Sequence, residues 1–154
     1  MISKARDEFV RKYAWALPSD QAIELLRGLR PLVEMGAGTG YWASLIGGDI
    51  ICYDINVPEI TYWPVAIGDP RSLGTGQRTL FLCWPPYNTP MAYDSLCYYK
   101  GKTVIYIGEG NGGCTGCDLF HEKLRKDFTC VKELAIPQWE NIHDYLTVWQ
   151  RDSV

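Results

Sequence analysis

The sequence lacks any apolar run that approaches the roughly 20 residues of a membrane-spanning helix. Its first segment, Met1 to Lys12, is charged and amphipathic and lacks the apolar stretch of a secretion signal. We therefore expect a cytoplasmic protein with no membrane partner. The 154 residues suffice for one domain with its own core and are too few for two. We expect a single domain over residues 1–154, with a helical segment at 1–30.

Basic residues are also scarce. The chain has 15 Lys and Arg residues against 18 Asp and Glu residues, which gives a formal net charge of −3. Nucleic-acid binding depends on clustered basic side chains, and here they are spread thinly. Charge therefore does not indicate a nucleic-acid partner and favours a small or neutral one.

Potential metal ligands are few. Cys114 and Cys117 form a single CxxC, followed by His121. A structural zinc site usually needs four ligands, and no fourth is evident. We predict no metal site. Three other cysteines lie in apolar, strand-like runs and are expected to be small buried hydrophobes: Cys52, Cys83 and Cys130.

Strand-like and helix-like segments alternate along the chain. The expected helices are 4–14, 20–29, 41–46, 91–99 and 118–126, and the expected strands are 32–35, 50–53, 79–83, 103–107, 129–136 and 145–150. This alternation predicts a largely parallel sheet with helices on both faces. The last two strands are joined by a segment too short for a parallel crossover, so they should be antiparallel.

The stretch from Asp54 to Thr79 departs from this alternation. It is rich in proline and glycine and leaves room for a short third strand at 62–67, with rudimentary or absent flanking helices. We expect a sheet that is reduced around its third strand and thinly covered at that edge. Either the helix at 4–14 covers this edge, or a second copy of the chain does so in a homodimer.

The segment Val33 to Gly40 reads Val-Glu-Met-Gly-Ala-Gly-Thr-Gly. Alternate glycines after an apolar strand allow a sharp turn and a close approach of a ligand to the backbone, and the following helix offers free N–H groups. Asp54 ends the next strand, where a carboxylate can accept both hydroxyls of a ribose. A dinucleotide turn needs a third small residue one helical turn further on. That position is the bulky Tyr41 or, two residues late, Ala43, so NAD is the weaker alternative.

The spacing E-x-G-x-G-x-G resembles motif I of the class I S-adenosylmethionine-dependent methyltransferases. The resemblance implies a Rossmann-like class I methyltransferase fold and S-adenosylmethionine as the cofactor. It places Glu34 near the methionine end of the ligand, Asp54 at the ribose and Asp69 near the adenine amino group. The remaining cofactor-binding residues that it implies lie in the turn: Gly36, Ala37, Gly38 and Gly40.

Cys83-Trp84-Pro85-Pro86-Tyr87 resembles the (Asp/Asn)-Pro-Pro-Tyr motif of amino-group methyltransferases. In those enzymes the polar residue and a proline carbonyl accept hydrogen bonds from the target amine, and the aromatic residue stacks on the substrate. Trp84 replaces the polar residue, which puts an amine acceptor in doubt. We expect Trp84 beside the cofactor, and Pro85, Pro86 and Tyr87 around a flat acceptor pocket, with Tyr87 also catalytic. A rigid strand end packed by aromatic residues is the alternative.

Two further catalytic candidates lie in loops. Glu109 opens a glycine-dense run, a type of loop that often carries a site. His143 titrates near neutrality and could act as a general base, although a hydrogen-bonded structural histidine is the alternative. Its neighbour Asp144 need not pair with it, because adjacent residues of a strand point to opposite faces. We expect Trp139 to line the acceptor pocket.

The whole chain also resembles one small methyltransferase-like family. The shared segments are YAWALP at 13–18, GAGTGYW at 36–42, WPPY at 84–87, GGCT at 112–115 and QWxxIHD at 138–144. The expected function is transfer of a methyl group from S-adenosylmethionine to an amine or hydroxyl of a small molecule or nucleobase. The alternatives are a non-catalytic module or partner subunit that binds S-adenosylmethionine or a nucleotide, and an NAD-linked oxidoreductase.

Overall fold

The structure is a computed structural model that describes residues 2–153. Its elements follow in the order α1 (Ile2–Lys12), α2 (Asp20–Gly28), β1 (Leu32–Met35), α3 (Tyr41–Ile46), β2 (Ile50–Asp54), β3 (Val65–Ile67), the 3₁₀ turn η1 (Pro70–Leu73), β4 (Thr79–Cys83), α4 (Met91–Tyr98), β5 (Thr103–Gly108), α5 (Asp118–Asp127), β6 (Phe128–Ala135) and β7 (Tyr145–Arg151).

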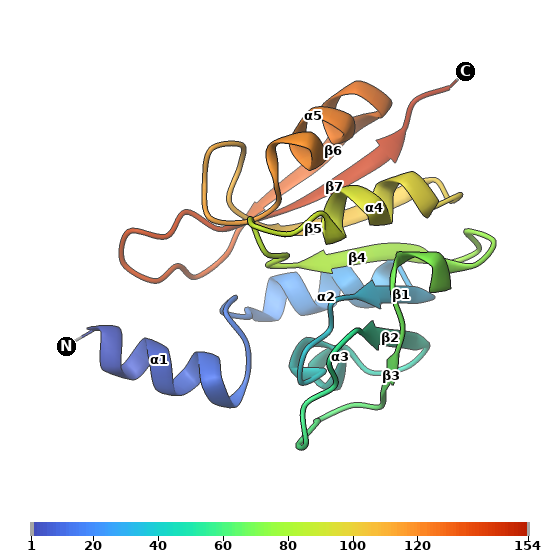
Figure 1. Cartoon of the computed structure of the whole chain (residues 1–154). Coiled ribbons are helices and arrows are strands. Elements are labelled where there is room, and N and C mark those ends of the chain that lie inside the picture. Colours follow the sequence, from blue (N-terminus) through green and yellow to red (C-terminus); the bar gives the residue numbers. More distant parts are fainter. Residues whose placement is uncertain (1, 154) are drawn as a thin grey trace.

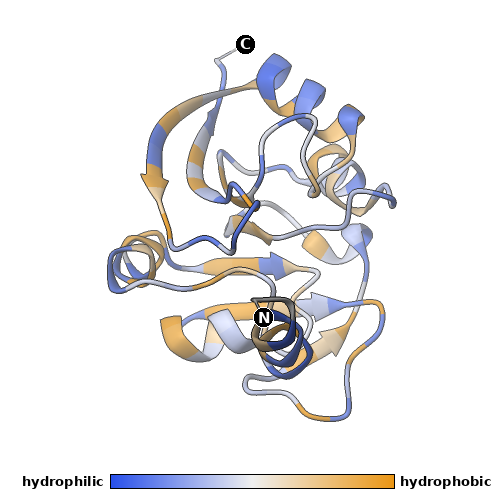
Figure 2. Cartoon of the chain, turned by 90° about the vertical axis from the view of Figure 1, so that its left-hand side faces the viewer, coloured by the Kyte–Doolittle hydropathy of each residue, from blue (hydrophilic) through white to orange (hydrophobic). Residues whose placement is uncertain are grey.

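All seven strands form one sheet in the order β3-β2-β1-β4-β5-β7-β6. The first five strands of this order are parallel, and β7 is antiparallel to both β5 and β6. The predicted parallel sheet with an antiparallel C-terminal hairpin is therefore confirmed. The carboxyl ends of the parallel strands share one edge of the sheet, and α1 lies beside that edge (Figure 1). Figure 2 looks onto the same edge and shows α1 nearly end-on in front of it.

The central strands of the sheet are buried on both faces. Alternate residues of β4 point to opposite sides, so that Phe81 joins the core under α2 and α3, whereas Leu80 and Leu82 join the core under α4 and α5. Trp42 of α3 fills the first core and Phe120 of α5 fills the second. These double-sided contacts explain why the central strands are continuous apolar runs rather than alternating ones.

The sheet is reduced around β3, as predicted. No helix lies between β2 and β3, and the short turn η1 is the only helical element between β3 and β4. Ile51 and Ile67 remain 38% and 80% exposed at this edge. The N-terminal helix reaches the segment before β3, because the Tyr62 hydroxyl donates to the Lys12 carbonyl at 3.1 Å and the Tyr62 ring packs on Tyr13. Coverage by a second copy stays a prediction.

Two expectations were wrong in detail. Cys130 is exposed rather than buried, because β6 is an edge strand most of whose side chains face solvent. The third strand forms only over Val65–Ile67, since the Tyr62 backbone N–H donates to the Thr39 carbonyl in the glycine turn, and Trp63 meets β2 only through its indole N–H, at the Ile50 carbonyl. Within residues 2–153, no helix has the length and apolar character to cross a membrane.

Candidate functional site

The glycine turn after β1 requires its glycines. Gly36, Gly38 and Gly40 have φ angles of 77°, 57° and 72°, which L-residues with a side chain rarely adopt. The Gly36 N–H donates to the Tyr53 carbonyl at 2.9 Å, which fixes the turn against the end of β2. A Cβ on Gly40 would lie 3.0 Å from both Cβ and the carbonyl oxygen of Trp63. The turn therefore has the geometry that the sequence predicts.

Asp54 lies at the end of β2, directly against this turn. Its Oδ2 accepts a hydrogen bond from the Gly38 N–H at 2.8 Å, and its Oδ1 accepts one from the Asn56 N–H at 3.0 Å. The carboxylate is only half-buried, and each oxygen retains lone-pair capacity for a further donor. Asp54 is thus a fixed acceptor beside the glycine turn.

Glu34 is the buried carboxyl of the site. It is 2% exposed, and its Oε1 accepts from the Cys52 thiol at 3.7 Å. Burial raises the pKa of Glu34 well above its ordinary value, an effect that the hydrogen bond from Cys52 opposes. The neutral acid is therefore favoured in the protein without a cation beside it.

Two cavities open at the carboxyl edge of the sheet. The larger, of about 470 Å³, is lined by Asp54 of β2, Pro86 and Met91, among others. The smaller, of about 220 Å³, lies under the segment that follows α1 and is lined by Glu34 of β1 and by Ala37, Gly38 and Thr39 of the turn. Gly36 and Trp84 line both cavities. The two cavities therefore meet at these two residues.

Asp69 lies near the larger cavity but serves a local role. Its carboxylate caps η1 by accepting from the Arg71 N–H at 2.9 Å, and it pairs with the Arg71 guanidinium at 2.6 Å. The Arg71 hydrogen bonds lower the pKa of Asp69. Its neighbour Pro70 lines the cavity, whereas Asp69 is not among the described lining residues. An adenine contact by Asp69 stays a prediction.

Trp84 has an unusual backbone and two defined contacts. Its φ of 53° lies in the left-handed region, which is rare for a large side chain. Its indole N–H points at both carboxylate oxygens of Asp144, each at 3.0 Å. Its ring stacks on Trp15, with 4.4 Å between centroids and 7° between planes. The residue that replaces the polar group of the motif therefore presents an aromatic surface and directs its only side-chain donor away to Asp144.

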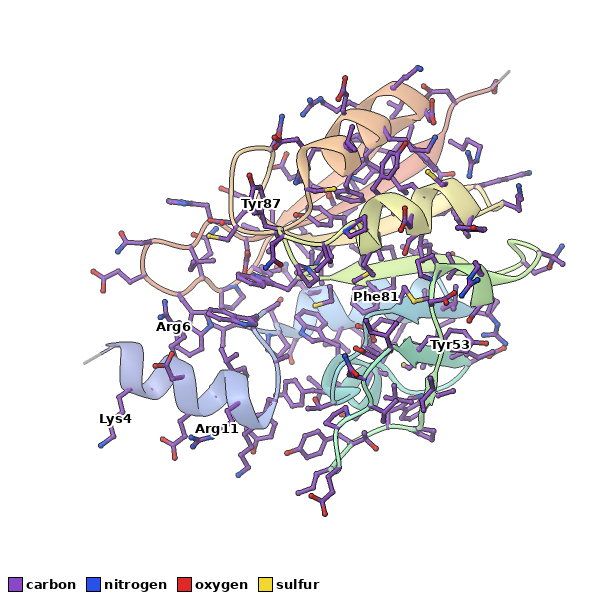
Figure 3. All side chains as sticks on the ribbon, viewed as in Figure 1. Lys4, Arg6, Arg11, Tyr53, Phe81 and Tyr87 are labelled. Atoms are coloured by element: carbon purple, nitrogen blue, oxygen red, sulfur yellow. The ribbon has the colours of Figure 1, made fainter. Side chains whose placement is uncertain are left out.

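The prolines and Tyr87 complete this strand end. The Pro85 carbonyl accepts from the Gly116 N–H at 3.0 Å, and Pro86 bridges to Thr115. Tyr87 is 50% exposed, on the same side of the molecule as α1 (Figure 3). The Pro85 carbonyl is thus already engaged within the protein, while the Tyr87 ring is available to a ligand.

Glu109 and His143, which are far apart in sequence, lie next to each other. Glu109 is 6% exposed; its Oε1 accepts from the Cys114 N–H at 2.6 Å and its Oε2 from the His143 N–H at 2.8 Å. Burial acts to raise the pKa of Glu109, but these backbone hydrogen bonds outweigh it and hold the pKa below its ordinary value. The His143 ring is mostly exposed, with Nδ1 at 3.6 Å from Oε2 of Glu109. The carboxylate joins two loops, and the imidazole faces outward.

Asp144 and Trp15 are the residues that sequence reasoning missed. Asp144 is 1% exposed, and burial raises its pKa to about 6, although the hydrogen bond from Trp84 opposes that shift. No local sequence pattern predicts the hydrogen bond between Trp84 and Asp144. Trp139, expected in the acceptor pocket, instead donates its N–H to the Trp15 carbonyl at 2.9 Å and packs on Phe9 of α1. A role of Trp139 in acceptor binding stays a prediction.

The CxxC segment shows no metal geometry within the described part of the chain, where no three His, Cys, Asp or Glu side chains are placed to hold an ion. Cys114 is exposed, Cys117 is half-buried, and the Nε2 of His121 lies 2.8 Å from the Thr115 carbonyl. This histidine therefore stabilises the loop.

Comparison with known proteins finds solved structures with a similar fold. No protein-family model matches the chain, and no curated protein does. Among solved structures, it is similar to the 1,6-didemethyltoxoflavin-N1-methyltransferase of Burkholderia thailandensis, solved with 1,6-didemethyltoxoflavin and S-adenosylhomocysteine. That match has a TM-score of 0.60 and 17% identity, and covers 98% of this chain and 88% of the other.

Two other similar solved structures are named for different activities. The magnesium protoporphyrin IX methyltransferase of Synechocystis PCC 6803, with bound S-adenosylmethionine, matches with a TM-score of 0.59 and 12% identity over 98% of this chain and 97% of the other. An rRNA methylase of Streptococcus thermophilus matches with a TM-score of 0.53 and 9% identity over 86% and 95%. The chain has the fold of the class I S-adenosylmethionine-dependent methyltransferases. That fold serves acceptors of several classes and names none for this chain.

Proposed function

We propose that this chain is an S-adenosylmethionine-dependent methyltransferase. The observation that supports it best is the pair of cavities that meet at Gly36 and Trp84, with Asp54 in one and Glu34 in the other. In open α/β sheets, ligands bind at the carboxyl ends of the strands. A cofactor with a nucleoside at one end and an amino acid at the other matches two adjacent cavities with a carboxyl group in each.

In this proposal Asp54 accepts hydrogen bonds from the ribose hydroxyls, through the lone pairs that its two contacts with backbone N–H groups leave free. Glu34 faces the ammonium group of the methionine part, and a cation there favours its ionised form. S-adenosylmethionine supplies a methyl group on a positively charged sulfur, so correct orientation of the acceptor contributes much of the rate acceleration.

The acceptor would approach from the side of Tyr87 and His143, whose side chains are exposed. Because the Trp84 side chain offers no hydrogen-bond acceptor, recognition of an amine through this motif is disfavoured. A hydroxyl acceptor would need a base. Glu109 is poorly suited to that role, since its low pKa and its two backbone contacts favour the bound carboxylate. His143 remains the better candidate.

Calorimetric titration with S-adenosylmethionine, S-adenosylhomocysteine and NAD tests the cofactor. We expect both sulfur compounds to bind, and Asp54→Ala to weaken S-adenosylhomocysteine binding by about 3 kcal/mol, roughly a hundredfold, because two hydrogen bonds to a carboxylate are lost. Asp118→Ala, which removes an exposed carboxylate at the start of α5, is the control and should bind normally. Binding of NAD alone would instead favour an oxidoreductase.

A non-catalytic binding module is the second candidate, and the replacement of the polar motif residue by Trp84 favours it. Methyl transfer to a fractionated metabolite extract separates the two. For an enzyme, Tyr87→Ala and His143→Ala should reduce transfer while changing cofactor affinity by less than about 1 kcal/mol. If the wild-type protein binds S-adenosylhomocysteine but transfers no methyl group to any fraction, the binding module becomes the function.

A further inference from the structure

Trp84 lies where the two cavities meet. If the nucleoside occupies the cavity of Asp54 and the amino acid that of Glu34, the sulfur that joins them must pass between Gly36 and Trp84. Trp84 is therefore one large side chain at that junction, and Met91, whose methyl group lies against Gly36, is the other. This step rests on the proposed function.

The other contacts of Trp84 fix how its ring is presented. Trp15 covers one face at 4.4 Å, and it lines only the smaller cavity. Trp84 also lines the larger cavity, and Trp15 leaves the opposite face of its ring uncovered by this stack. The N–H edge is held by both oxygens of the buried Asp144. The ring thus has one orientation and one strongly held donor.

Such a ring attracts a cation. Trp is the best aromatic partner for a positive charge within about 6 Å of the ring centre, and a carboxylate that accepts the indole N–H polarises the ring further. The stack already holds one cation, since the Arg6 guanidinium lies 5.4 Å from the centroid of Trp15. In Figure 3 Arg6 points from α1 towards the loops, whereas Lys4 points away from them.

We infer that Trp84, polarised by Asp144, is a platform that selects the positively charged sulfonium of S-adenosylmethionine over the neutral thioether of S-adenosylhomocysteine. The attraction is present before methyl transfer and is lost with the charge afterwards. It would thereby favour binding of the cofactor and release of the product.

Paired titrations of S-adenosylmethionine and S-adenosylhomocysteine at pH 7.5 test this selection. Asp144→Asn keeps an oxygen that can accept the Trp84 N–H but removes the charge, and it should weaken S-adenosylmethionine binding at least fivefold while changing S-adenosylhomocysteine binding less than twofold. Trp84→Phe keeps a ring without the N–H and should shift the ratio in the same direction.

Glu109→Gln is the matched control, because it neutralises a second buried carboxylate that contacts backbone N–H groups instead of the indole. It should alter the binding of both compounds alike. If the ratio of the S-adenosylmethionine and S-adenosylhomocysteine affinities is unchanged in both Asp144→Asn and Trp84→Phe, the proposed role of Trp84 is wrong. If Glu109→Gln shifts this ratio as much as Asp144→Asn does, the selection comes from the overall negative charge of the site and not from the Trp84 ring. If Asp144→Asn does not fold, Trp84→Phe decides alone. Failure of the wild-type protein to bind either compound would instead contradict the proposed function.

Discussion

The two sides of the site are held together by different kinds of interaction. On the glycine side, the contacts are mostly to neighbouring strands: the Gly36 N–H meets the Tyr53 carbonyl, and the Gly38 N–H meets Asp54. On the side of Trp84, side chains bridge remote loops, as Glu109 does to His143 and Trp84 does to Asp144. One side is shaped by the backbone and the other by buried polar side chains.

This difference predicts different sensitivities. The glycine side should respond to an added Cβ, because its φ angles exclude most side chains. The opposite side should respond to pH, because its two buried carboxyls have shifted pKa values of opposite sign: that of Asp144 is raised and that of Glu109 is lowered. Substitutions confined to one side of the site show whether the two sides respond independently.

The largest expected effect comes from the titration of Asp144. Burial raises its pKa from 3.8 to about 6, and the carboxyl is 1% exposed. Between these values the unfolded chain loses the proton first, so the contribution of Asp144 to folding should fall by about 3 kcal/mol in total as the pH rises from about 3 to about 7. Urea unfolding of the wild-type protein and of Asp144→Asn at several pH values measures it.

The relevant quantity is the difference in unfolding free energy between the two proteins, because other groups such as the nearby Glu109 also contribute to the pH dependence of the wild-type protein. Relative to the wild-type protein, Asp144→Asn should gain stability as the pH rises through this window. If the difference in unfolding free energy does not change with pH, ionisation of Asp144 does not destabilise the folded protein.

The next largest effect is expected from Gly40→Ala on the glycine side. The left-handed φ of 72° costs an alanine about 1–2 kcal/mol, and the new Cβ would meet Trp63 at 3.0 Å, so we expect a loss of about 2 kcal/mol and weaker S-adenosylhomocysteine binding. Gly28→Ala is the control, because nothing lies within 4 Å of its Cβ position in α2. It should stabilise the protein by about 0.5 kcal/mol. Equal behaviour of the two variants would contradict the strained turn.

The glycine side was also the part that the sequence predicted best. Its determinants are local: positive φ angles demand glycine, and an acid at the end of the next strand falls beside them because parallel neighbours share one edge. Most strands were predicted within one or two residues for a similar reason, since apolar runs such as Thr79–Cys83 are buried on both faces. The reduced third strand followed from too few residues for two crossover helices.

The opposite side could be predicted only in outline. Glu109 and His143 were singled out separately, but no pattern states that the carboxylate would bind the backbone of the histidine. The pairing of Trp84 with Asp144 spans 60 residues, and that of Trp139 with Trp15 spans 124. Such contacts depend on how loops from different strands meet, and a single sequence carries no signal for that.

A smaller effect is expected from Glu109→Gln, which tests the loop junction. The glutamine has one amide oxygen for the two backbone N–H groups of Cys114 and His143, and its NH₂ group faces the N–H that is left without an acceptor. We therefore expect the free energy of unfolding to fall by about 1.5 kcal/mol near pH 7. Because the pKa of Glu109 is lowered, its stabilisation is present above the ordinary carboxyl pKa and is lost as the pH falls. The gap between wild-type and variant should therefore narrow on acidification, opposite to the behaviour of Asp144. Urea unfolding at pH 7 and pH 4 checks the sign, and a gap that widens at pH 4 would exclude this role.

The smallest effect is expected from Trp139→Phe, which tests whether the N-terminal segment is fixed to this side of the site. The variant keeps a ring near Phe9 but loses the hydrogen bond to the Trp15 carbonyl, at a cost of about 1 kcal/mol. Trp149→Phe is the matched control, since it loses one indole hydrogen bond of the same length, to Thr147 within β7. Both variants should lower the free energy of unfolding by similar amounts.

Only Trp139→Phe should speed cleavage after Lys12 in limited trypsin digestion, because it is the hydrogen bond of Trp139 that ties residue 15 to the loop before β7. Equal cleavage rates in the two variants would mean that the stacking of Trp15 on Trp84 holds the segment without help from Trp139.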